Sequence, residues 1–171
     1  MSSIYSRQRI RPYLEASLLV AMGLVLSGFT IYQAPGGGSI TLGSTIPVCI
    51  VGLRWGVKIG VLAGVAFGLL SFLASGILIG LAPFVIDYIL AYASLGLCGL
   101  FRRAPFCGIL LAQCVRFAFH VLSGVVYFSD GKSTHDAFIF SMQYNAFYLI
   151  PETLLGLMLF KQLIQRQTLK P

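Results

Sequence analysis

The sequence predicts an all-α integral membrane protein, built as a bundle of six transmembrane helices with both termini in the cytoplasm. Two properties of the chain lead to this fold class. Of its 171 residues, 57% are hydrophobic and only 10% are charged, whereas about a quarter of the residues in a soluble domain are charged. In addition, connections that carry basic residues alternate along the chain with connections that lack them, as expected for a multi-pass membrane protein.

The apolar residues fall into six segments, which we expect to form one membrane domain over residues 1–171. The segments cover residues 13–31, 44–54, 57–76, 81–101, 105–128 and 137–164. A helix over 44–54 would extend about 16 Å, which is too short to cross about 30 Å of hydrocarbon alone. This segment is therefore expected either to extend back into the glycine-rich stretch before it or to be partly re-entrant.

The distribution of lysine and arginine sets the predicted orientation. Of the twelve such residues, ten lie in the N-terminus, the RWGVK and FRRAP connections and the tail, whereas Lys132 lies on the other side and Arg116 lies within a segment. Positive charge is enriched in cytoplasmic connections, so both termini are predicted to be cytoplasmic, in the plasma membrane. Basic residues placed at the ends of apolar segments also argue against nucleic-acid binding.

The sequence favours neither a metal site nor a disulfide. The chain has four cysteines, without a CxxC pair, and two histidines. We expect Cys49, Cys98, Cys107 and Cys114 to be small buried hydrophobic residues. The chain also lacks HExxH, GxSxG and nucleotide-binding motifs. It is therefore predicted to have no enzymatic activity, no bound cofactor and no means of using ATP by itself.

Asp87 is the clearest candidate for a binding residue. It is the only charged residue between Lys58 and Arg102, and a carboxylate at bilayer depth usually marks a functional site. An aspartate there suits a cationic ligand or the donor edge of a heterocycle. The structural alternative is a salt bridge to Arg116 or His120, and a ligand could replace such an internal partner.

Two later segments carry further polar groups. His120 follows Arg116 by four residues, which places both side chains on one helix face, and Phe128 lies two turns beyond His120. Asn145, next to Tyr144, could both donate to and accept from a pyrimidine or amide edge. The alternatives are a packed histidine, a structural arginine and an asparagine that only bonds a neighbouring helix.

Five blocks of the sequence, in order over roughly residues 15–157, resemble one known family. The blocks are PGGGSI, IPVCIVGLRWGVKIG, DYILAYASLGLCGLF, RFAFHVLSGVVYF and FSMQYNAFYLIPE. They are similar to the thiamine-specific substrate-binding (S) component of energy-coupling factor transporters. The resemblance implies a six-helix membrane protein that captures thiamine from outside and docks on a transmembrane scaffold subunit driven by two cytoplasmic ATPases. ATP would then be used only by those partner subunits.

The resemblance also implies roles for particular residues. The acidic residue and tyrosine that contact the ligand match Asp87 and Tyr88, the histidine matches His120, the stacking aromatic matches Phe128 and the asparagine matches Asn145. The first loop, with Gly38 and Ser39, would cover the pocket. The small residues on the first helix that face the scaffold match Ser17 and Ala21.

This chain departs from the family pattern at several positions. Some members have glutamate in place of Asp87, tryptophan in place of Phe67 and Phe128, and tyrosine in place of Phe140. Some also have an acidic residue and a tryptophan in the first loop, which this chain lacks. We include Phe67, Phe140 and Tyr144 among the predicted ligand-binding residues.

The chemistry of thiamine agrees with these residues. Thiamine is a cation, so a buried carboxylate suits its charge and aromatic faces suit its two rings. Three alternatives remain at this point. They are an S component for another vitamin or precursor such as hydroxymethylpyrimidine, an intramembrane enzyme that uses Asp87 and His120 as acid and base, and a membrane scaffold without a ligand. The lack of a nucleophile argues against the enzyme.

Overall fold

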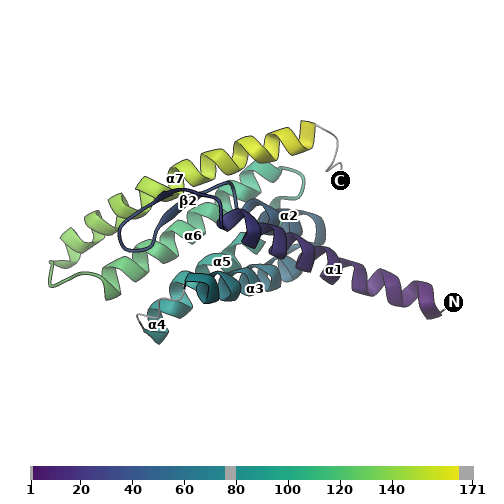
Figure 1. Ribbon diagram of the computed structural model, residues 1–171, viewed down its shortest axis with the longest axis horizontal. Helices are drawn as coiled ribbons and strands as arrows, with labels where there is room; N and C mark the ends of the chain where they lie inside the picture. Colours follow the sequence, from purple (N-terminus) through teal and green to yellow (C-terminus); the bar gives the residue numbers. More distant parts are fainter. Residues whose placement is uncertain (1, 76–79, 166–171) are drawn as a thin grey trace.

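The structure, a computed structural model, describes the backbone of residues 2–75 and 80–165 and the side chains of residues 9–74 and 80–165. Within these ranges the chain is mostly helical and forms an elongated bundle with one short hairpin (Figure 1). The elements are α1 Ser2–Ser27, β1 Thr30–Gln33, β2 Ser39–Thr41, α2 Ile46–Trp55, α3 Val57–Ser75, α4 Leu81–Phe84, a π-helical turn η1 Val85–Leu90, α5 Ala91–Ala93, a 3₁₀ stretch η2 Ser94–Phe101, α6 Pro105–Tyr127 and α7 Thr134–Gln165.

Some positions used in the topology prediction lie outside these ranges. The side chain of Arg7, the tail residues Arg166 and Lys170, and residues 76–79 of the third predicted connection are not among those described. The predicted segment 57–76 therefore corresponds to α3 up to its last described residue, Ser75.

Five helical runs in the described part of the chain are long and apolar enough to cross a membrane. They are Arg9–Ser27, Val57–Ala74, Leu81–Phe101, Pro105–Tyr127 and Thr134–Gln165. Many of their leucines face outward, including Leu18, Leu73 and Leu81, as expected for side chains that contact lipid. The coarse prediction of a helical, multi-pass membrane protein agrees with this architecture. The second predicted segment forms α2, which has only 10 residues.

The first predicted segment was extended too far. Helix α1 ends at Ser27, not at residue 31, and the next residues form strand β1. Strand β1 pairs with β2 in antiparallel register, with Tyr32 opposite Ile40. The turn between the strands contains Gly36 and Gly37, whose φ angles of 91° and 109° strongly favour glycine. The predicted first loop therefore contains a two-stranded hairpin.

The fourth segment is one continuous but irregular helix. It passes from α4 into the π-helical turn η1, then through α5 into the 3₁₀ stretch η2. The 3₁₀ stretch packs on α2 and α3 through glycines: a Cβ on Gly60 would lie 2.7 Å from Gly52 Cα and 2.8 Å from Gly96 Cα. Small residues at this crossing let three backbones approach closely, which is a common way to pack helices in lipid.

The core lies where α2, α3, η2 and α6 meet. Its largest fully buried side chains include Phe67, Leu95, Ile109 and Val48. The four cysteines are free, but only Cys49 and Cys98 are buried. The prediction that all four are buried was wrong for Cys107 and Cys114, which lie on the outward face of α6. Apolar composition does not separate a core-facing position from a lipid-facing one.

The two ends of the bundle are built from different elements. At one end, Glu15 of α1 accepts a hydrogen bond from Trp55 Nε1 at 3.1 Å and lies 3.4 Å from an Arg54 guanidinium nitrogen. The other end carries the hairpin, α4 and the α6–α7 connection. Figure 1 shows the beginning of α1 and the end of α7 directed away from that second end.

Candidate functional site

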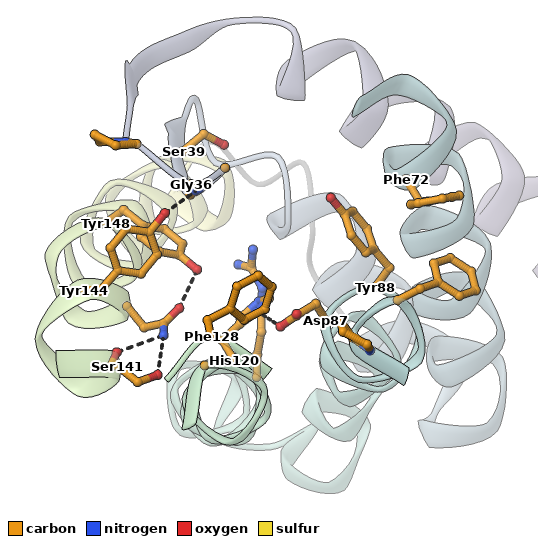
Figure 2. Close-up of a pocket in the computed structure, with 18 of the residues that line it drawn as sticks. Gly36, Ser39, Phe72, Asp87, Tyr88, His120, Phe128, Ser141, Tyr144 and Tyr148 are labelled. Atoms are coloured by element: carbon orange, nitrogen blue, oxygen red, sulfur yellow. Dashed lines mark hydrogen bonds and ion pairs between the residues drawn. The ribbon is translucent and has the colours of Figure 1, made fainter. Parts of the chain in front are cut away.

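A cavity of about 620 Å³ opens between the hairpin, the α4–α5 run, α6 and α7. This volume is within the range of about 300–1,000 Å³ that is usual for small-molecule sites. The hairpin contributes Gln33 and Pro35–Ser39; α3 contributes Phe72; the α4–α5 run contributes Gly80, Pro83, Phe84, Asp87, Tyr88 and Tyr92; α6 and the residues after it contribute Arg116, His120, Gly124, Phe128 and Asp130; and α7 contributes Phe140, Ser141, Tyr144, Asn145 and Tyr148. Figure 2 shows these side chains converging from different elements.

Asp87 lies at the centre of the polar part of the lining. Its Oδ1 lies 2.8 Å from His120 Nδ1, and its Oδ2 accepts a hydrogen bond from the Ser123 hydroxyl. When the carboxylate is ionised it only accepts hydrogen bonds, and His120 Nδ1 is then the donor of this contact. Asp87 keeps 22% of its side chain exposed, so part of the carboxylate faces the cavity.

The local backbone explains how Asp87 reaches the cavity. It belongs to the π-helical turn η1, which inserts one extra residue into the helical ladder, and such turns are frequent at functional sites. His120 is nearly enclosed, and its Nε2 has no hydrogen-bond partner among the described residues. The pair thus presents a carboxylate oxygen to the cavity, whereas the unpaired ring nitrogen is itself enclosed and would reach a ligand only if the surrounding side chains moved.

A second polar group lies across the cavity on α7. Asn145 Nδ2 donates to the Ser141 carbonyl at 2.9 Å, and Asn145 Oδ1 accepts from the Tyr148 hydroxyl at 2.7 Å. The dashed lines in Figure 2 follow these bonds. Asn145 is buried, and its amide is held in one orientation by these neighbours. It can bind a ligand only by sharing or exchanging them.

Aromatic rings line much of the remaining surface. Tyr88 and Tyr92 are spaced one turn apart on one wall, and their ring centroids are 6.4 Å apart. On the opposite wall, Phe140 and Tyr144 are stacked at 6.4 Å with 18° between their planes. Phe128 projects between these walls in Figure 2. Flat aromatic faces on both sides suit a flat cationic ligand.

Arg116, which also lines the cavity, is buried. It forms an ion pair with Glu152, with 3.4 Å between Arg116 Nη1 and a Glu152 carboxylate oxygen, and its guanidinium lies 4.8 Å from the centre of the Tyr92 ring. Of the two partners that the sequence suggested for Asp87, only His120 contacts it. Arg116 has a carboxylate of its own.

The structure brings most of the predicted ligand-binding residues together. Nine of the ten line the cavity, namely Gly38, Ser39, Asp87, Tyr88, His120, Phe128, Phe140, Tyr144 and Asn145. The exception is Phe67, which is 1% exposed in the core. It packs edge-on against Tyr92, with the centroids 5.1 Å apart, so it supports a lining residue without reaching the cavity. Ser17 and Ala21 lie exposed on α1, away from the cavity.

Sequence reasoning assigned no role to several residues that complete the site. Tyr92 follows Tyr88 by four residues, Ser123 follows His120 by three and Ser141 precedes Asn145 by four, so helical spacing from the assigned residues could have found them. Glu152 lies on the same face of α7, eight residues after Tyr144, but its pairing with Arg116 and Thr41 could not be found in this way, because these partners lie on other elements. Among the described side chains, no group of three or more His, Cys, Asp or Glu residues could hold a metal ion.

Comparison with known proteins gives consistent results. The model of the thiamine transporter protein family (Thia_YuaJ) matches residues 13–170. The chain is 31% identical to the thiamine transporter ThiT of Bacillus subtilis over an alignment 168 positions long, which covers 85% of each chain. Its fold is similar to a solved structure of ThiT from Listeria monocytogenes, with a TM-score of 0.81 and 22% identity over 93% of this chain and 96% of that one.

Proposed function

Because the chain belongs to the thiamine transporter protein family, we propose that the cavity next to Asp87 is its thiamine site and that the protein is the S component of an energy-coupling factor importer. The family is one of transport proteins, so the hypothesis of an intramembrane enzyme is set aside. The observation that carries the proposal is the Asp87–His120 pair at 2.8 Å in an aromatic cavity.

The chemistry of the cavity supports this ligand. Thiamine carries a fixed positive charge on its thiazolium ring and an amino group on its pyrimidine. The Asp87 carboxylate can accept from the amino group or neutralise the charge, and the ring nitrogen of His120 can bond a pyrimidine atom. The faces of Tyr88, Phe128 and Tyr144 can hold the rings by stacking and cation–π contact. Phe140 lies beside Tyr144 and extends that face.

We also propose that the chain crosses the membrane six times as one domain, with both termini in the cytoplasm. Helix α2 is short, but Trp55 at its end bonds Glu15. Glu15 lies twelve residues, about 18 Å of helix, before the end of α1 at Ser27. After α1, the hairpin and α2 together therefore run back alongside α1 as far as Glu15, and we count them as the second membrane crossing. The end with Trp55 carries Arg54, Lys58, Arg102 and Arg103, whereas the described connections at the cavity end carry only Lys132, which favours an outward-facing cavity.

Calorimetric titration of the detergent-purified protein tests the ligand. We expect tight one-to-one binding of thiamine. Pyrithiamine, in which a pyridinium ring replaces the thiazolium and keeps the positive charge, should bind nearly as well, whereas free hydroxymethylpyrimidine, which lacks the charged ring, should bind more weakly. Binding of hydroxymethylpyrimidine alone would favour an S component for a precursor. A folded sample that binds none of the three would reject the assignment of the cavity.

Delivery of thiamine requires partners, and we propose that a scaffold subunit contacts α1 at Ser17 and Ala21, with ATP used only by two ATPase subunits on the cytoplasmic side. Both residues are small and exposed, one turn apart, which permits close helix packing in lipid. Ser17→Trp and Ala21→Trp should abolish uptake in cells but spare thiamine binding. Met22→Trp is the control, because Met22 is also exposed but lies about 140° around the helix from Ser17. Unchanged uptake in both test variants would reject this face.

A further inference from the structure

Glu152 is a buried acidic residue. All five Asp and Glu residues of the chain lie in the part that the structure describes, and among them only Glu152 is buried, at 3% exposure. It does not line the cavity. Its carboxylate instead receives side chains from two other parts of the chain: Arg116 of α6, and the Thr41–Ser44 segment that follows the hairpin.

The contact with Thr41 ties the hairpin to α7. Thr41 Oγ1 lies 3.1 Å from Glu152 Oε1, Ser44 Oγ lies 3.4 Å from the same oxygen, and the two hydroxyl oxygens are 2.8 Å apart. Each hydroxyl has one proton to donate, so Thr41 donates to Glu152 either directly or through Ser44. Both hydroxyls are buried, and a hydrogen bond to a buried carboxylate is stronger than one between neutral groups.

A second attachment lies at the other end of strand β2. The Gly38 amide donates to the Tyr144 hydroxyl at 3.1 Å. A Cβ on Gly38 would lie 2.5 Å from the Tyr148 ring, so the strand rests directly against that side chain. Figure 2 shows Tyr144 and Tyr148 directed toward the hairpin. Only a residue without a side chain permits this approach.

The attachment points on the helix form a single row. Tyr144, Tyr148 and Glu152 are spaced four residues apart, and side chains at this spacing are neighbours along a helix. From Tyr144 to Glu152 the helix rises about 12 Å, and from Gly38 to Thr41 an extended strand covers about 10 Å. The segment from Gly38 through strand β2 to Thr41 therefore matches this row in length.

We propose that Glu152 is a positioning residue for ligand retention. It holds β2 in register along the row Tyr144–Tyr148–Glu152, and thereby holds the Gly36–Ser39 turn over the cavity. Arg116 keeps the carboxylate in place from the other side. Glu152 touches no ligand, and its effect on binding passes through the hairpin. The effect on ligand retention rests on the proposed function, whereas the anchoring of the hairpin does not.

The test compares two buried threonines. In Thr41→Val the shape is kept but the bond to Glu152 is lost. In the control Thr45→Val an equally buried hydroxyl is lost, one that accepts from Gln113 Nε2 at 2.9 Å and does not contact Glu152. Thiamine should dissociate about tenfold faster from Thr41→Val, as expected for loss of one bond to a charged group. Dissociation from Thr45→Val should be unchanged, and Thr41→Ser, which keeps the hydroxyl, should restore the slow rate.

Amide hydrogen exchange in the ligand-free protein provides a readout that does not depend on thiamine. Exchange over residues 30–41 should accelerate in Thr41→Val but not in Thr45→Val. If Thr41→Val does not fold, Ser44→Ala removes the other donor and should accelerate exchange in the same segment. Equal exchange in the Thr41 or Ser44 variant and the control would overturn the anchor. Faster exchange with an unchanged dissociation rate would overturn the role in retention, whereas a wild-type protein that binds no thiamine would reject the proposed function alone.

Discussion

Two carboxylates in this bundle, Asp87 and Glu152, lie in opposite kinds of environment. Asp87 is 22% exposed and faces the cavity, and its partners are a histidine and a hydroxyl. Glu152 is 3% exposed and pairs with an arginine that is equally enclosed. The first arrangement leaves room for a cationic ligand to approach the carboxylate. The second has no such room, and its charges are satisfied within the protein.

The two environments predict different roles, namely ligand binding for Asp87 and support of the structure for Glu152. A ligand can compete with His120 for Asp87, because histidine need not be charged to donate its hydrogen bond. No ligand can easily replace Arg116 beside Glu152, because removing one member of a buried pair leaves the other charge uncompensated. We therefore expect changes at Asp87 to appear mainly in affinity and changes at Glu152 mainly in stability.

The largest effect should come from Glu152→Gln. The amide keeps the shape and can still accept from Thr41, but Arg116 loses its counter-charge. Loss of one partner of a buried ion pair destabilises a protein by about 3–5 kcal/mol. Thermal unfolding in detergent, with the double variant Arg116→Met/Glu152→Leu as the control, measures this effect. The double variant should recover much of the stability, and a Glu152→Gln protein as stable as wild type would contradict the description of a sealed ion pair.

The next effect is expected for Asp87→Asn. The asparagine keeps the size of the side chain but removes the negative charge, so thiamine affinity should fall by about 30- to 100-fold, the equivalent of about 2–3 kcal/mol for a bond to a charged group. Stability should change by less than about 1 kcal/mol, because the group is partly exposed. The measurement is calorimetric titration together with thermal unfolding. An Asp87→Asn protein that loses stability but keeps its affinity for thiamine would contradict the role in ligand binding that we assign to Asp87.

Much of the fold was predictable because apolar segment length is read directly from the sequence. The predicted segments 105–128 and 137–164 correspond to α6 and α7 within a few residues. The end of the first segment was wrong because its last residues, Gly28 to Ile31, are as compatible with a lipid-facing helix as with a strand. The pairing of Thr30–Gln33 with Ser39–Thr41 depends on contacts that a local pattern does not contain.

The site was predictable where a residue is unusual for its surroundings. Asp87 and His120 are conspicuous in apolar segments, and the structure places them in contact. Phe67 is not conspicuous, because an aromatic residue in an apolar helix fits a core as well as a ligand pocket. The pairing of Arg116 with Glu152 was missed for another reason: which of two possible carboxylates meets an arginine is decided by how the helices pack.

A smaller effect on affinity is expected at Asn145. Its amide is occupied by Ser141 and Tyr148, so Asn145→Ala removes a possible ligand contact and also releases the Tyr148 hydroxyl. We expect thiamine affinity to fall about tenfold, as for the loss of one or two neutral hydrogen bonds. Ser141→Ala is the matched control, because it removes one bond to the same amide but leaves the amide in place. If Asn145→Ala and Ser141→Ala bind thiamine with the same affinity, Asn145 acts only through its hydrogen bonds to Ser141 and Tyr148.

The smallest effects should distinguish two phenylalanines that the sequence analysis treated alike. Phe128 lines the cavity, whereas Phe67 is enclosed in the core. Phe128→Leu should weaken thiamine binding by a few fold, since an aromatic contact contributes about 0.5–1.5 kcal/mol beyond its buried area, and should leave the unfolding temperature nearly unchanged. Phe67→Leu should do the opposite, with a loss of stability on the order of 1 kcal/mol from the space it leaves and little change in affinity. Calorimetric titration and thermal unfolding of both variants show whether each phenylalanine contributes to thiamine affinity or to stability. A strong loss of binding in Phe67→Leu would mean that Phe67 affects thiamine binding by holding Tyr92 in position. Residues directly behind the cavity lining would then also have to be counted among those that determine affinity.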